Sequence, residues 1–240
     1  MKTLRLLAST LLLLALSGCS MTVFESLPTG ETTRCDPAWP GHWAQVKSMS
    51  GKASEGSPEV IEIDATCSKS GKPGDTEPAP LLLVTTPDGR QYIDFMNEDG
   101  SQRCKPGAKD DAKDGKKCGH MLLRYEHVGD EIRVYEVDHG KAAALIRGKK
   151  IRGETEQLAL PEESDPKKDK PEPVYFNIVA GDARRVDKVL RDTPELFASE
   201  PLMVMRRATP EEIAAEAARQ AAKEAQEAEE TAAEGDAGEP

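Results

Sequence analysis

Short alternating runs of apolar and polar residues dominate the middle of the chain. Residues 60–66 carry β-branched side chains on a period-two background, and residues 81–85 form a compact apolar run. Pro87-Asp88-Gly89 is a turn sequence between that run and residues 91–96, so this stretch predicts a β-hairpin. The pattern is typical of strands joined by tight turns.

Two further turn sequences extend the series. Val128-Gly129-Asp130 lies between residues 121–127 and 131–137, and Gly148 lies between residues 143–147 and 150–154. We interpret both as hairpins, which gives an antiparallel succession of strands. Regularly spaced hairpins usually fold as a β-sandwich or a small barrel. The fold class predicted is therefore mainly β.

The pattern changes near the C-terminal end of this region. Residues 174–179 are strand-like, and Gly181-Asp182 then opens a helical pattern with Val186, Val189 and Leu190 on one face. Thr193-Pro194-Glu195 resembles the cap and first turn of another short helical piece, after which residues 202–205 return to a strand pattern. The sequence thus predicts a short α segment near the end of the β-rich region.

The last 32 residues have a composition of their own. Thr209-Pro210-Glu211-Glu212 is a capping box with Pro at the first helical position, and it begins an Ala/Glu-rich run. Ile213 is nearly the only large apolar residue of this run, so it predicts an exposed helix without a packing stripe. Ten acidic residues against two basic ones place most of the net charge of −11 in this tail. The remaining chain shows no basic patch, which argues against nucleic-acid binding.

A leader begins the chain. Lys2 and Arg5 precede an apolar run at residues 6–16 that is too short to span a bilayer, as in secretory signal peptides. Leu16-Ser17-Gly18-Cys19 then resembles the lipobox of bacterial lipoproteins. The resemblance implies cleavage before Cys19, a diacylglycerol on its thiol and usually an acyl chain such as palmitate on its amine. Ser20, where Asp favours inner-membrane retention, implies the outer membrane.

The cysteine count agrees with export. Once Cys19 is assigned to lipid, Cys35, Cys67, Cys104 and Cys118 remain, and four cysteines in an exported chain indicate two disulfides. Three pairings are possible, of which we favour Cys35–Cys67 with Cys104–Cys118. The alternative, a four-cysteine metal site, lacks a C-x-x-C pair, and we predict no metal and no cofactor.

These features divide the chain into four segments. We predict a signal peptide at residues 1–18, a lipidated tether at 19–34, one β-rich periplasmic domain at 35–208 and an acidic helical to disordered tail at 209–240. Two polar stretches, residues 100–119 and 155–173, are predicted to be solvated loops.

No catalytic motif stands out. The sequence has no G-x-S-x-G, H-E-x-x-H, phosphate-binding glycine loop or dinucleotide fingerprint, and His42, His120, His127 and His139 are scattered. We interpret these histidines as ordinary surface or partly buried residues. We therefore expect that the protein is not an enzyme, although catalytic groups can converge from distant positions.

Gly41-His42-Trp43 resembles the G-x-W that opens the first strand of lipocalins. The resemblance implies a barrel whose Trp closes one end of a cavity for a lipid or another small apolar ligand. In that case we expect the cavity to be lined by Trp43, Ile63, Leu83, Phe95 and Leu123. The alternative is that Trp39 and Trp43 are packing anchors of a sheet.

Two functions follow from these observations. The first is a non-catalytic envelope lipoprotein, anchored through Cys19 to the periplasmic face of the outer membrane. It would act in assembly, scaffolding or stress by contacts with an unidentified envelope protein. The second is the lipocalin-like binder.

Overall fold

The computed structural model describes residues 20–47, 58–65, 67, 81–95, 103–104, 118–158 and 173–235. The predicted signal peptide and Cys19 lie outside these residues, as do most of the two predicted loops. Contacts divide the chain into two compact units. The first comprises residues 1–34, 80–125 and 135–200, and the second comprises residues 35–79, 126–134 and 201–240.

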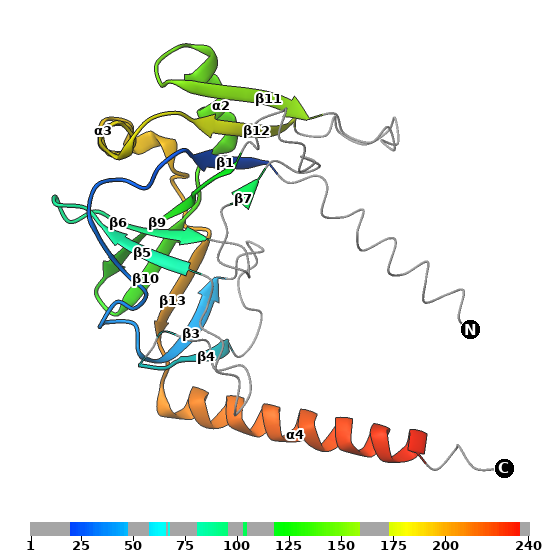
Figure 1. Ribbon diagram of the computed structural model, residues 1–240. Coiled ribbons are helices and arrows are strands. Elements are labelled where there is room, and N and C mark those ends of the chain that lie inside the picture. The colour runs from blue at the N-terminus through cyan, green and yellow to red at the C-terminus, as the bar shows by residue number, and fades with distance from the viewer. Residues whose placement is uncertain are drawn as a thin grey trace. The chain divides into compact units, whose positions relative to one another are not determined.

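The first unit contains two groups of strands and the two short helices (Figure 1). One group is antiparallel in the order β2 (Glu31–Thr33), β5 (Leu81–Thr85), β6 (Gln91–Phe95) and β9 (Met121–Val128). The other is a three-stranded sheet in the order β1 (Met21–Phe24), β12 (Val174–Val179) and β11 (Gly153–Leu158). β7 (Arg103–Cys104) and β8 (Cys118–Gly119) form a short separate ladder.

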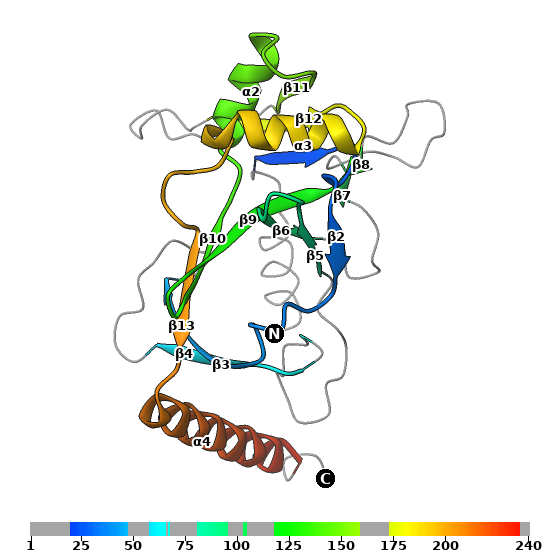
Figure 2. The ribbon, with the colours of Figure 1, turned by 90° about the vertical axis from the view of Figure 1, so that its left-hand side faces the viewer.

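Helices α2 (His139–Arg147) and α3 (Ala183–Asp192) supply the helical side of the core in this unit (Figure 2). Each is capped by an aspartate, Asp138 or Asp182, whose side chain accepts a hydrogen bond from the backbone N–H three residues on. The short 3₁₀ helix η1 (Pro194–Leu196) follows α3. The core joins side chains from helices and sheets: Phe24, Val84, Tyr92, Leu122, Tyr135, Val137, Ala142, Ile146, Ile151, Val179, Val186, Leu190, Leu196 and Phe197.

The second unit contains the antiparallel order β10 (Glu131–Tyr135), β13 (Met203–Arg207), β3 (Gly41–Lys47) and β4 (Glu59–Ile63), followed by α4 (Pro210–Gly235). β9 and β10 each pass from one unit into the other, and the eight strands share one sheet order that begins at β2 and ends at β4. The sheet is therefore open. The mainly β class, the late short α segment and the exposed C-terminal helix are confirmed, whereas the barrel alternative is wrong.

The third predicted hairpin is also wrong, because residues 143–147 belong to α2. Ala142, Ala143 and Ile146 are buried at positions that share one helix face, and Asp138 caps the N-terminus. Ala has the highest helix propensity, so an Ala-rich run with an Asp cap favours a helix over a strand. The turn at Gly148 ends this helix, since its N–H donates to the carbonyl of Ala144.

Residues 19–34 do not form the predicted tether over their described part. Residues 21–24 form β1, in which Val23 and Phe24 have no exposed surface, and residues 31–33 form β2. Apolar side chains on a strand gain stability by burial, and β1 finds a partner in β12. The folded region thus begins before the predicted boundary at Cys35.

Candidate functional site

The first described residues form hydrogen bonds with a strand about 155 positions later in the sequence. The Ser20 hydroxyl accepts a hydrogen bond from the backbone N–H of Tyr175 at 3.0 Å, across 155 residues of sequence. β1 then runs parallel to β12, from Met21 opposite Phe176 to Phe24 opposite Val179. Phe24 also exchanges two backbone hydrogen bonds with His120, at 2.9 and 2.8 Å. β1 is therefore fixed along its whole length.

A buried polar network fastens β1 to helix α2. The Asn177 amide donates to the Thr22 hydroxyl and to the carbonyl of His139, each at 3.0 Å, and its oxygen accepts from the Thr155 hydroxyl at 2.6 Å. The Thr22 hydroxyl lies 2.9 Å from Nδ1 of His139. Burial lowers the pKa of His139, which keeps its imidazole neutral for this network. Asn177 and Thr22 are at most 1% exposed, so the network satisfies polar groups that have lost water.

An aspartate–histidine pair joins Asp94 of β6 to His120, the residue directly before β9. Nδ1 of His120 is 2.7 Å from Oδ2 of Asp94, which is 1% exposed. The other Asp94 oxygen has no hydrogen-bond partner among the described residues. A buried carboxylate can orient an imidazole and support proton transfer. Because His120 also bonds through its backbone to Phe24, the pair strengthens the attachment of β1.

His120 is partly buried, as expected, but its interpretation as an ordinary surface or partly buried residue does not include this contact with Asp94. Asp94 lies opposite Leu122 in the β6–β9 register, and His120 lies two positions before Leu122 on the same face. The two side chains meet because of the register between β6 and β9. The alternating patterns of residues 91–96 and 121–127 predict two strands, but they do not say which residues lie opposite each other.

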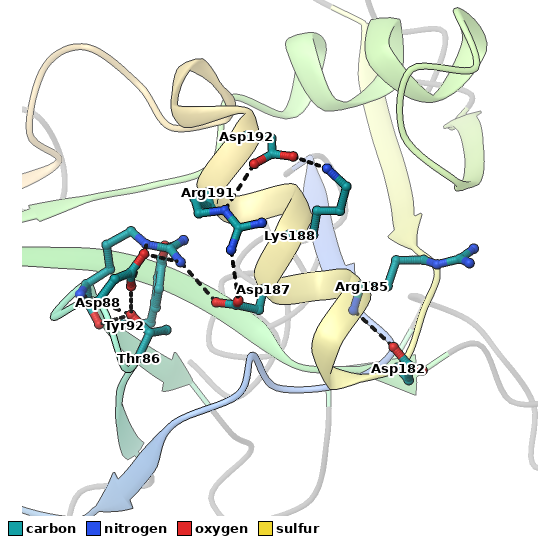
Figure 3. Close-up of polar contacts among 10 residues, drawn as sticks. Thr86, Asp88, Tyr92, Asp182, Arg185, Asp187, Lys188, Arg191 and Asp192 are labelled. Carbon is teal, nitrogen blue, oxygen red and sulfur yellow. Dashed lines mark hydrogen bonds and ion pairs between the residues drawn. The ribbon is translucent and has the colours of Figure 1, made fainter.

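The β5–β6 turn is tied to α3 by an ionic cluster (Figure 3). Arg90 binds both carboxylate oxygens of Asp88 through Nε and reaches Asp187 of α3 at 3.0 Å. It also donates to the Tyr92 hydroxyl at 3.1 Å. Hydrogen bonds from Thr86 and Arg90 lower the pKa of Asp88 to about 2. The cluster is structural, since each charge has a partner and Tyr92 is buried in the core.

The five predicted ligand-lining residues are divided between the two units. Trp43 and Ile63 belong to the second unit, whereas Leu83, Phe95 and Leu123 belong to the first. Leu83 and Leu123 share a sheet face, because both lie opposite Ile93. None of the five lines the hollow of about 160 Å³ on β11 and β12, whose walls are Glu154, Thr155, Glu156, Phe176 and Ile178.

Trp43 is a packing anchor. It is 3% exposed, its ring N–H donates to the carbonyl of Trp39 at 2.6 Å, and the Arg207 guanidinium lies 4.0 Å from its ring centre. Arg207 also donates to the carbonyls of Pro40 and Ala38, at 2.8 and 2.7 Å. This arrangement fixes the start of β3, where Gly41 has a φ of +127° that favours glycine.

The cysteines agree with the predicted pairing. Cys35 and Cys67 form a disulfide with their Cα atoms 5.1 Å apart. Cys118 is also disulfide-bonded, and Cys104 lies directly opposite it in the β7–β8 ladder. The Cys35–Cys67 disulfide is confirmed, and it closes the segment that holds Trp39 and Trp43.

Neither a metal centre nor a spanning helix emerges from the part of the chain that the structure describes. No three His, Cys, Asp or Glu side chains there come together as metal ligands. No helix there is both long and apolar enough to cross a bilayer. Comparisons of the chain with protein-family models, with curated proteins and with solved structures gave no match.

Proposed function

We propose that this chain is a lipid-anchored envelope protein that acts through protein contacts rather than catalysis. The observation that carries the proposal is Leu16-Ser17-Gly18-Cys19 at the end of a short apolar leader. Two or three acyl chains hold a protein firmly, because each buried methylene contributes about 0.8 kcal/mol. The disulfide between Cys35 and Cys67 supports export, since such bonds persist in oxidising compartments. The outer membrane, with the protein facing the periplasm, is the proposed address.

Protein contact is supported by the charged, solvated surfaces of the helices. From Ala217 to Gln226 every α4 residue is exposed, and this stretch has no apolar stripe to pack on its own unit. On α3, Lys188 pairs with Asp192, while Arg191 contacts Asp187 and Asp192. Polar surfaces of this kind suit transient partner binding better than an obligate interface.

The anchor is tested by fractionation. Cys19→Ser removes the acylated thiol, so we expect the variant to fold and to leave the membrane fraction after a salt wash. Ser20→Ala, which keeps the cysteine, is the matched control and stays with membranes. Cys19→Ser protein that still sediments with washed membranes would contradict lipid anchoring.

The contact role is tested by crosslinking in intact cells. A photo-crosslinking residue at Ala218, on the exposed part of α4, is expected to capture a defined envelope protein. A crosslinker at Thr32 of the exposed strand β2 serves as the comparison site. If neither site captures any protein above the background of cells without irradiation, the proposed contact role fails.

A further inference from the structure

The start of β1 lies at one end of the three-stranded sheet in the first unit. Ser20, Tyr175 at the start of β12 and Leu158 at the end of β11 meet there, since Ser20 bonds to Tyr175 and Leu158 lies opposite Val174. We call this end, with Ser20, Met21, Leu158, Pro173, Tyr175 and Arg147, the anchor end.

The distance from the anchor end to Cys19 is fixed by covalent geometry. Successive Cα atoms are about 3.8 Å apart, and Ser20 is already bonded to Tyr175. No residue between Cys19 and the fold is left to act as a flexible spacer. We propose that the first unit sits directly on the bilayer, with its anchor end against the lipid headgroups. This seating rests on the lipid anchor proposed above.

The side chains of the anchor end suit a headgroup layer. Tyr175, Met21 and Leu158 are each partly exposed, and Met21 and Leu158 pack on the apolar cluster of Val23, Phe176 and Ile178. The exposed Arg147 places its guanidinium 5.3 Å from the centre of the Tyr175 ring. Aromatic, apolar and cationic side chains together are typical of a surface that meets phospholipid phosphates and the upper acyl region. The occupant is therefore the membrane that holds the acyl chains of Cys19.

Depth-sensitive fluorescence quenching tests this seating. Lipidated Tyr175→Trp protein is reconstituted into phosphatidylethanolamine/phosphatidylglycerol vesicles with or without a lipid carrying a nitroxide near its headgroup. Each reporter is compared with the parent protein, which carries the same Trp39 and Trp43. We expect the added tryptophan to lose most of its emission in nitroxide vesicles. Pro173→Trp is a second reporter at the same end, in case substitution of Tyr175 disturbs folding.

Two controls give the result its meaning. Arg184→Trp places the reporter on α3, which follows the opposite end of β12. The nitroxide lipid is expected to quench this variant no more than it quenches the parent. A flexible Gly/Ser insert of about 16 residues between Cys19 and Ser20 adds a mean reach of roughly 20 Å. With this insert the protein stays membrane-bound, and the quenching of the Tyr175→Trp reporter is lost.

The outcomes separate the seating from the anchor. Anchored protein whose reporters at the anchor end are unquenched without the insert overturns the seating and leaves the anchor intact. Equal quenching with and without the insert also overturns it, because proximity would then not depend on the short connection. Wild-type protein that is not acylated and does not bind membranes overturns the proposed function, and the seating fails with it.

Discussion

His139 joins helix α2 to the N-terminal strand through its imidazole, which lies 2.9 Å from the Thr22 hydroxyl. Its folded-state pKa is lowered by burial, whereas an unfolded histidine titrates near pH 6.5. The unfolded state therefore takes up the proton first as pH falls. By linkage, the free energy of unfolding should decrease below about pH 6.5 until the folded-state pKa is reached.

A His139→Gln variant tests this prediction. Its free energy of unfolding, measured by urea titration between pH 8 and pH 5, should fall less steeply than that of the parent. His42→Gln removes a half-buried histidine outside this network and serves as the control for the general effect of replacing a histidine by glutamine. Parallel curves for the parent and His139→Gln would show that His139 titrates alike in both states.

Arg90 and Asp187 form the link between the β5–β6 turn and α3. Their side chains are 23% and 15% exposed, so the pair is only partly screened by water. Asp187→Asn keeps the shape and removes the charge, and it should cost on the order of 1 kcal/mol of unfolding free energy. Denaturation of a double-mutant cycle with Arg90→Gln measures the coupling. Lys188→Gln, at an exposed ion pair, is the control and should change stability much less.

Strand β1 is an integral part of the core. Phe24 is fully buried with residues of α2, α3 and β12 around it, and Phe→Ala substitutions in cores cost about 3–5 kcal/mol. Phe24→Ala should destabilise the protein by that amount in denaturant titration. Thr32→Ala, in the exposed strand β2, should cost little. Equal stability of the two variants would restore the tether interpretation.

The α4 helix covers the edge of β4 with polar groups. Glu216 accepts from the backbone N–H of Val60 at 3.3 Å, and Arg219 donates to the carbonyl of Pro58 at 2.9 Å. Exposed strand edges pair readily with other chains, so these contacts protect the edge. Glu216→Ala with Arg219→Ala should increase self-association in sedimentation at rising concentration. Glu224→Ala, on the exposed part of α4, leaves the edge contacts intact and should remain like the parent.

Local turn and cap chemistry explains which elements the sequence could predict. Pro87-Asp88-Gly89 specifies the β5–β6 hairpin, and Asp182 specifies the start of α3, so both were predicted within a residue or two. β1 was missed because its four residues lie among polar neighbours and pair with a strand 155 positions away. The Asp94–His120 pair was missed for the same reason, since it depends on strand register.

The two units can be observed separately because their aromatic residues are divided. Both tryptophans, Trp39 and Trp43, belong to the second unit, and all four tyrosines, at positions 92, 125, 135 and 175, belong to the first. Tryptophan fluorescence therefore follows the unfolding of the second unit. Tyrosine near-ultraviolet signals follow the first.

The Cys35–Cys67 disulfide lies within the second unit and joins residues 32 positions apart. Chain-entropy estimates give about 4 kcal/mol for a loop of this size. A Cys35→Ala/Cys67→Ala variant should therefore unfold at lower urea by tryptophan fluorescence, while the tyrosine transition stays in place. A Cys35→Ser/Cys67→Ser variant removes the same disulfide with polar side chains in place of alanine. Comparing the two variants separates the loss of the disulfide from changes in side-chain packing. If both probes shift together by the same amount, the units unfold as one cooperative body, and the disulfide stabilises the whole chain.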